Sequence, residues 1–340
     1  MSKAILTRLD GAENLTANVG FSDVQDVVND FDSRYPWNSI TEIEDANGEK
    51  WIRILPFYTY YETDSNGVIT GRKISEYKID DNWFLNPIFI KGDRILPYVD
   101  VAKYLMSNEN GIGFTRSGDK PIKNITPKVA RQYANAKSDV SHDVFLENIW
   151  VLQLLQDLFA VEFATTKCQE VLKGYVYSKY SSSSKANGTT DIVPYVTGTE
   201  SQIGNASGTH TMKYRGIENL WGNGQTFIDG IKFDGENILV SLDPVYDGDY
   251  NTYVDSAIKR PLSGGVVYQL KYDSGVHLSF PVAVNSKGRY ENVLSTSSGM
   301  NTVLYNGNNS DNCGLWTYST TVGATSVLPH GTYRLVRRPK

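Results

Sequence analysis

Residues 216–231, GIENLWGNGQTFIDGI, constrain the fold of this chain more than any other stretch. Three glycines and two asparagines in this stretch surround one large side chain, Trp221. Glycine and asparagine tolerate a positive φ angle better than other residues do. We therefore expect a tightly wound loop that is anchored by a buried indole and followed by a short strand.

The chain ends in GTYRLVRRPK, a pattern that is typical of a closing strand. Its apolar positions are Tyr333, Leu335 and the flanking Val336. The three arginines around them, Arg334, Arg337 and Arg338, are expected to be solvated.

Together, the two segments resemble the core signature of the formylglycine-generating-enzyme (sulfatase-modifying-factor) branch of the C-type-lectin-like fold. In that branch, a loop of the type WGNVWEW is followed far downstream by a terminal strand of the type GFRLVR. The motif GIENLWGN is similar to motifs in structural proteins of tailed bacteriophages. The resemblance extends over residues 37–338, and it implies one C-type-lectin-like domain over residues 37–340.

The order of elements leads to the same fold class without the resemblance. Two strand-like runs, 51–62 and 68–79, flank an Asp-Ser-Asn-Gly turn and predict a hairpin. Helical segments follow over 126–163, and short strands and long loops occupy 192–340. This segregation predicts an α+β protein with antiparallel strands, two helices and long loops.

Two helices are predicted in the middle of the chain. The first begins after Thr126, which is followed by a proline at the first helical position. The second follows Ser141, and its apolar residues recur at three- and four-residue steps. Glu147 and Asp157 are expected on the solvated face of this second helix. Residues 177–191, rich in serine, glycine and asparagine, predict a long flexible excursion.

Residues 1–36 are polar and weakly patterned. They have too few apolar positions to pack a core, so we expect an N-terminal attachment arm that is ordered only by a partner chain. Its partners would be other virion proteins.

Composition excludes several classes of protein. Of 340 residues, 40% are hydrophobic and 21% are charged, as in a folded globular chain. The net charge of −5 argues against nucleic acid as the main partner. No run approaches the length of an apolar membrane span, and the first residues lack the apolar core of a signal peptide. We therefore expect synthesis in the host cytoplasm and no membrane insertion.

Catalysis is not expected from this sequence. The oxidase branch of the resembled fold holds copper with two cysteines that lie close together near the C-terminus. Here Cys313 has no second cysteine nearby, and Cys168 lies in the helical half, so both are expected to be buried free thiols. A glycosidase would need two convergent carboxylates. The many aspartates after residue 228 stand at turn positions, where aspartate is ordinary.

One metal site is considered. In the resembled family the NLWGN loop often binds calcium, which would carry over to Asn219 and Asn223. Oxygen donors in a tight loop suit this hard cation. The acidic run 243–251 is a second candidate for calcium, and the alternative that the asparagines only stabilise turns stays open. No other cofactor is expected.

The candidate receptor-binding surface lies within residues 286–322. Asparagine, serine and tyrosine dominate this segment, a composition that combines adaptable hydrogen-bonding groups with rigid aromatic anchors. The alternative of an ordinary polar loop remains. The residues expected together on one exposed face are Tyr290, Asn306, Asn308, Asn309, Asn312, Trp316 and Tyr318.

The sequence is thus interpreted as a non-catalytic virion protein of a tailed phage: a tail fibre, a tail tip, or a head fibre or decoration protein. It is expected to form a homotrimer and to bind a host-surface glycan or protein through the C-terminal loops, gaining avidity from its several copies. The alternative is a purely structural component that contacts only other particle proteins.

Overall fold

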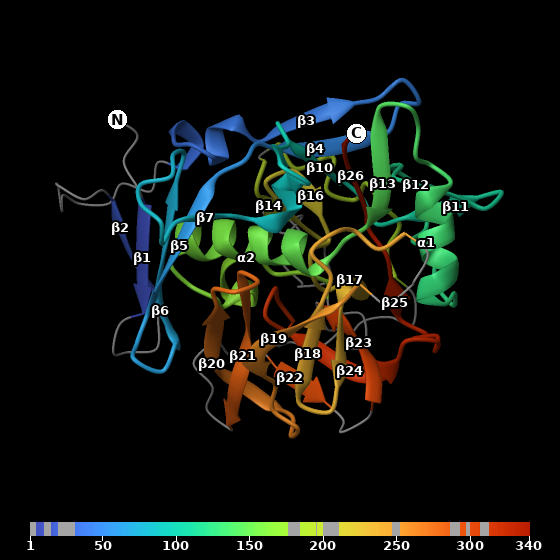
Figure 1. Cartoon of the computed structure of the whole chain (residues 1–340). Coiled ribbons are helices and arrows are strands. Elements are labelled where there is room, and N and C mark those ends of the chain that lie inside the picture. Colours follow the sequence, from blue (N-terminus) through green and yellow to red (C-terminus); the bar gives the residue numbers. More distant parts are fainter. Residues whose placement is uncertain are drawn as a thin grey trace.

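The computed structural model describes residues 5–9, 15–19, 31–175, 184–194, 196–199, 211–246, 252–285, 293–296, 300–306 and 313–340. Within these residues the chain is mostly β, with two helices of more than two turns. Figure 1 shows the longer helix, α2 (Ile149–Phe163), at the centre, with sheets on several sides of it.

Helix α2 begins later than the apolar spacing predicts. His142–Leu146 form strand β13, and Asn148 caps the helix by accepting a hydrogen bond from the Val151 amide at 3.0 Å. The predicted start after Ser141 is therefore wrong. β13 pairs with the last strand of the chain, β26 (Leu335–Pro339), and the sequence around residue 142 carries no sign of this distant partner.

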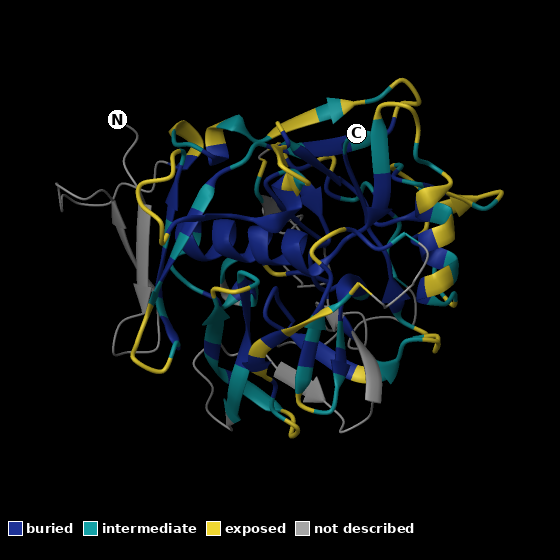
Figure 2. Cartoon of the chain, viewed as in Figure 1, coloured by how far each residue is buried: buried dark blue, intermediate teal, exposed yellow. Residues whose placement is uncertain are grey.

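The expected solvated face of α2 does not exist. Every residue from Ile149 to Glu162 is buried, and Figure 2 shows the helix as buried along nearly its whole length. The helix contacts strands of more than one sheet, so no side faces water. Asp157 is 1% exposed and Glu147 3%, so the expectation of solvated carboxylates is wrong for both.

Buried partners compensate the charge of Asp157. The Tyr61 hydroxyl donates to both carboxylate oxygens at 2.8 and 2.7 Å, and Arg72 Nε donates to Oδ1 at 3.1 Å. Burial nevertheless raises the pKa of Asp157 to about 6, against the opposing effect of Arg72.

The terminal strand lies inside a sheet rather than at its edge. The order is β13-β26-β10-β4-β3, and neighbouring strands in it are antiparallel. The first half of the chain and its last residues therefore build one sheet. The remaining strands are β3 (Thr41–Glu44), β4 (Lys50–Ile54) and β10 (Val99–Ala102).

A second sheet contains the predicted hairpin, which is confirmed for residues 58–75. The start of the predicted run 51–62 belongs instead to β4 of the first sheet. β5 (Tyr58–Thr63) pairs with β6 (Ile69–Ser75) across the Asp64–Gly67 turn. The full order is β2-β1-β6-β5-β7, where the other strands are β1 (Ile5–Leu9), β2 (Leu15–Val19) and β7 (Phe84–Leu85).

Those N-terminal residues that the structure describes contact the rest of the chain. β1 pairs with β6, from Ile5 opposite Ile74 to Arg8 opposite Gly71. Phe31, in the short 3-10 helix Phe31–Ser33, is 3% exposed and lies edge-on against Trp37 at 4.7 Å between ring centroids. The expectation that residues 1–36 are ordered only by another chain is wrong for these parts, because β6 and the core of the same chain supply their contacts.

A nine-stranded sheet holds the described strands between Gln225 and Thr332. Its order is β19-β18-β17-β23-β24-β22-β20-β21, with β25 pairing parallel to β17. Most neighbours are antiparallel, and β22 with β24 is parallel. The strands are β17 (Gln225–Asp234), β18 (Asn237–Val240), β19 (Val254–Lys259), β20 (Gly265–Asp273), β21 (Leu278–Asn285), β22 (Val293–Thr296), β23 (Met300–Asn306), β24 (Tyr318–Gly323) and β25 (Gly331–Thr332).

The first predicted helix is confirmed. α1 (Pro127–Asn135) begins with proline, and Thr126 Oγ1 accepts from the Val129 amide at 3.3 Å. Figure 1 places it at the outer side of the molecule. The smaller elements are α3 (Cys168–Val171), the 3-10 helices Trp37–Ser39 and Pro87–Phe89, and strands β8 (Ile90–Lys91), β9 (Arg94–Ile95), β11 (Ser107–Glu109), β12 (Ile112–Phe114), β14 (Gly198–Thr199), β15 (Met212–Tyr214) and β16 (Ile217–Glu218).

The predicted fold class is thereby confirmed at the level of an α+β-like protein with several antiparallel sheets and two main helices. Among the described residues, no helix has the length and apolar character needed to cross a membrane.

Candidate binding site

The glycine- and asparagine-rich loop is built on Trp221, as predicted. Trp221 is 1% exposed, and its Nε1 donates to the Leu172 carbonyl at 3.2 Å. Phe159 of α2 meets it edge-on, with 5.6 Å between ring centroids. At Gly222, where φ is +99°, a Cβ would come within 2.6 Å of the Tyr175 carbonyl oxygen, so only glycine fits this close approach.

The two asparagines proposed for calcium have roles in the protein itself. Asn223 Oδ1 accepts from the Lys185 amide at 2.7 Å, and its Nδ2 donates to the Lys185 carbonyl at 3.1 Å. Asn219 adopts a φ of +57°, and its Nδ2 donates to Glu218 at 3.1 Å. These bonds support the alternative that the asparagines stabilise turns. Calcium binding stays a prediction.

Glu218 connects the same loop to residues 184–191. Its carboxylate accepts from the amides of Gly188 at 2.9 Å and Thr190 at 2.8 Å. Asn187 is 3% exposed and Thr190 is fully buried. The expectation of a flexible excursion is therefore wrong for residues 184–191, since a buried carboxylate of the Trp221 loop fixes their backbone.

The arginines of the terminal strand are buried, which corrects the expectation that they are solvated. Arg334 has no exposed surface, and Nη2 donates to the carbonyls of Glu218 at 2.7 Å and Asn219 at 3.0 Å. Nη1 donates to the Ala102 carbonyl at 2.9 Å. Arg334 Nε also lies 3.3 Å from Glu147 Oε2. Arg334 thus joins the terminal segment to the Trp221 loop.

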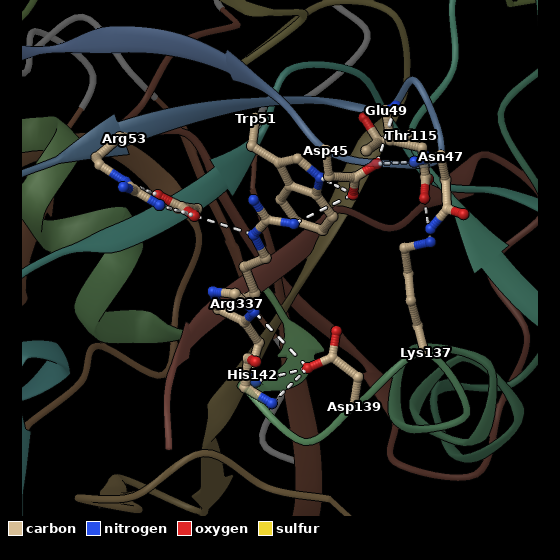
Figure 3. Close-up of polar contacts among 12 residues, drawn as sticks. Asp45, Asn47, Glu49, Trp51, Arg53, Thr115, Lys137, Asp139, His142 and Arg337 are labelled. Carbon is tan, nitrogen blue, oxygen red and sulfur yellow. Dashed lines mark hydrogen bonds and ion pairs between the residues drawn. The ribbon is translucent and has the colours of Figure 1, made fainter.

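Arg337 is the centre of a second network, drawn in Figure 3. Its guanidinium pairs with Asp100 at 2.9 Å and with Asp45 at 3.1 Å. Asp45 also accepts from Trp51 Nε1 at 2.9 Å, while Asp100 accepts from Arg53 Nε at 2.8 Å. Arg337 is 8% and Arg338 3% exposed, because β26 is an interior strand of its sheet.

A fully buried carboxylate, Glu49, lies beside this network. Its oxygens accept from the Thr115 amide at 2.7 Å and pair with the Lys137 ammonium group (Figure 3). Burial and the nearby Arg337 charge lower the pKa of His142, so this imidazole favours the neutral form. The ion pair of Glu49 with Lys137 connects the turn before β4 to the residues that follow α1, so Glu49 has a structural role.

Two of the predicted receptor-binding residues belong to the core, which is a correction. Trp316 is fully buried, and its indole lies 6.2 Å from the Phe159 ring. Tyr318 is 2% exposed, and its hydroxyl accepts from Gln156 Nε2 at 2.6 Å. The composition of the segment suggested surface anchors, but α2 lies against its C-terminal part and covers both rings.

The strand register nevertheless brings together the strand ends that flank two predicted binding segments. Residues 286–292 leave β21 at Asn285 and return at Val293, and both of these residues pair with Val266 of β20. Residues 307–312 follow Asn306, which pairs with Tyr318. Leu294, next to Val293, pairs with Tyr318 as well. The two segments therefore start from one row of residues across the nine-stranded sheet.

The remaining predicted residues are located only in part. Asn306 is the last residue of β23 and lies in this row. The other four lie outside the described residues, within the two segments that start from the row: Tyr290, Asn308, Asn309 and Asn312.

The sequence did not single out a pocket of about 360 Å³ between the segment 78–85 and the β8–β9 turn. Two exposed apolar residues line it, Ile90 and Ile95. The residues before this turn form the short strand β7, the 3-10 helix Pro87–Phe89 and the start of β8. The sequence signal that could have revealed a surface site is the isoleucine at each end of the short turn 90–95, Ile90 and Ile95.

Both cysteines are buried thiols outside any disulfide, as predicted. Burial raises the pKa of Cys168 to about 12, so the thiol is inert. The Leu315 amide donates to Cys168 Sγ at 3.4 Å, so the fold brings Cys168 next to the segment that contains Cys313.

No protein-family model matches this chain, and a search of curated proteins finds no matching relative either.

Proposed function

We propose that this chain is a non-catalytic virion protein of a tailed bacteriophage that binds the host surface. In this proposal, residues 286–292 and 307–312 carry the contact groups, with Tyr290, Asn308, Asn309 and Asn312 among them. The observation that carries it is the row of Asn285, Val293 and Asn306, from which both polar segments leave one sheet. Binding residues are common on loops that a rigid scaffold positions.

The scaffold for this role is proposed to be a C-type-lectin-like domain. Two observations support that fold. The loop and the strand on which the resemblance rests are joined directly by Arg334, and the terminal strand pairs with β10 from the first half of the chain. In this proposal the buried Trp316 and Tyr318 anchor the chain next to the binding segments in the core, and they make no receptor contact themselves.

Cell binding tests the proposal. Purified labelled protein is added to cells of the bacterium that propagates the phage, and retention on the cells is measured. The triple variant Asn308→Ala, Asn309→Ala, Asn312→Ala should lose binding, because each substitution removes a side-chain amide that donates and accepts hydrogen bonds. The matched control is Asn47→Ala, Asn66→Ala, Asn108→Ala, three exposed asparagines elsewhere in the chain, which should bind like the parent.

The result separates the two functions considered. Retention by the parent and loss in the first triple variant would support receptor binding. A parent protein that is not retained on cells, but that co-purifies with other particle proteins, would favour the purely structural component.

The same preparation tests the proposed homotrimer. Light scattering after size exclusion should give a mass near three times 37.9 kDa. A monomer mass at the working concentration would remove the avidity argument.

A further inference from the structure

We propose that the pocket beside the β8–β9 turn binds a ring of a neutral saccharide. This site is independent of the loop surface in the proposed function. It is lined by His277, in the turn that joins β20 to β21, whereas residues 286–292 leave the opposite end of that hairpin. Seven residue steps along β21 separate the two ends by roughly 20–25 Å at the usual rise of a strand.

An aromatic stack lies at the pocket, since two of the lining residues, Phe84 and His277, pack ring against ring. Phe84 lies parallel to the His277 ring, with 4.6 Å between centroids and 6° between planes. The Tyr272 ring stacks on Phe84 at 5.3 Å, and its hydroxyl lies 2.8 Å from His277 Nδ1. This packing fixes the positions of the rings before any ligand arrives, which lowers the entropy lost on binding.

His277 is held in an unusual backbone conformation. Its φ is +58°, a value that few residues other than glycine adopt. Gln153 of α2 fixes this turn, because its Nε2 donates to the His277 carbonyl at 2.8 Å and its Oε1 accepts from the Ser279 amide at 2.8 Å. The turn is thus anchored in the core while the imidazole lines the pocket.

The charged side chains that line the pocket have a net charge of zero. Lys78 and Arg94 supply two cations, and Asp81 and Asp93 supply two anions. A site with both donors and acceptors and no net charge suits hydroxyl groups, each of which donates and accepts. An anionic or a cationic ligand would meet two like charges among these four groups.

Apolar surface at the opening completes the fit. Ile95 is 58% exposed and Ile90 39%, and they face each other as a pair across β8 and β9. With the half-buried Tyr58 and with Trp83, which also line the pocket, they offer apolar contacts to the C–H faces of a sugar ring. The volume of about 360 Å³ lies within the range of small-molecule pockets, about 300–1,000 Å³.

Saccharide titration of the full chain tests the site. The probes are neutral trisaccharides (maltotriose, cellotriose and chitotriose), each followed by calorimetry, with trigalacturonate as an acidic comparison. At least one neutral probe should bind, and the acidic probe should bind more weakly. Asp81→Asn and Asp93→Asn, both at exposed positions, should each weaken binding about tenfold through a lost hydrogen bond to a charged group.

The matched control is Asp255→Asn. Asp255 forms an exposed ion pair with Lys259 at 3.5 Å on β19, comparable with the exposed pair of Asp81 and Lys78 at 2.8 Å. The control variant and the Asn308/Asn309/Asn312 triple variant should bind the saccharide like the parent. This result would hold even if the loop surface proves to have no receptor.

Three outcomes would overturn the inference. One is the absence of binding by every neutral probe, and another is binding that both pocket variants retain in full. The third is self-association of the parent that Ile95→Asp abolishes, which would show that the exposed apolar residues are a protein interface.

Discussion

Arg334 donates a hydrogen bond from Nη2 to the Glu218 carbonyl at 2.7 Å. The terminal segment thereby reaches the Trp221 loop, 116 residues earlier in the chain. The Trp221 loop and the terminal segment are one structural unit, because a fully buried guanidinium joins them. Its burial lowers the pKa of Arg334, while the Glu147 carboxylate opposes that effect.

Replacing Arg334 should destabilise the protein strongly. Arg334→Met leaves Glu147 buried without its cation and removes donors from several backbone carbonyls, and losing one partner of a buried ion pair costs about 3–5 kcal/mol. Urea denaturation measures the free energy of unfolding. The control Arg94→Met, at an exposed position, should change it by less than about 0.5 kcal/mol. Equal stability of the two variants would refute the joining role of Arg334.

Truncation of Trp221 should also be costly. Trp221→Ala removes a buried indole beneath the glycine loop and leaves a cavity, so we expect a loss of about 3–5 kcal/mol. Tyr77→Ala truncates an aromatic residue that is 59% exposed and serves as the control. A melting temperature of Trp221→Ala equal to that of the parent would show that the indole does not anchor the loop.

Trp316 and Tyr318 should behave as core residues. Trp316→Ala should cost about 3–5 kcal/mol in the free energy of unfolding, and any loss of cell binding should follow the loss of folded protein. Tyr318→Phe keeps the ring and removes only the hydroxyl that accepts from Gln156, so its cost should be about 1 kcal/mol. Full thermal stability of Trp316→Ala together with lost cell binding would restore the surface interpretation.

Asp157 should make stability depend on pH in a defined direction. Its folded pKa of about 6 lies above the ordinary value of 3.8, so between these values the unfolded chain releases a proton that the folded protein keeps. The stability of the parent relative to Asp157→Asn should therefore fall as pH rises from about 4 to about 6, and stay level above that. The fall should be roughly 1–3 kcal/mol, since one pKa unit is worth about 1.4 kcal/mol.

Urea denaturation of both proteins at several pH values checks this slope. Comparing the parent with the variant isolates Asp157 from other buried carboxylates, such as Glu147 and Glu162, whose pKa values burial also raises. A difference that grows with rising pH would mean that the Arg72 ion pair outweighs burial.

Deleting residues 1–36 should destabilise the domain rather than leave it intact. The deletion removes β1, a partner of β6, and also Phe31, which is 3% exposed. Phe31→Ala alone should cost about 3 kcal/mol or more by creating a cavity against Trp37. Thermal melts of the deletion and of Phe31→Ala test this. An unchanged melting temperature in both would return residues 1–36 to the role of a separate arm.

The sequence alone determined those elements whose signals are local. Thr126 and the following proline mark the start of α1, and the Asp64–Gly67 turn joins two strands of the predicted hairpin. The glycines around Trp221 predict a wound loop with a buried anchor. In each case residues within a few positions of one another carry the physical cause, so composition and spacing are sufficient.

Only the tertiary structure decided which polar and aromatic residues face the core. The sequence predicts that Arg334 and Asp157 are solvated and that Trp316 lies in a surface loop, yet all three are buried. Their burial depends on what lies across from them: the strands beside β26, and the strands around α2. A buried charge is tolerated only where distant segments supply its partners, and no local pattern encodes that pairing.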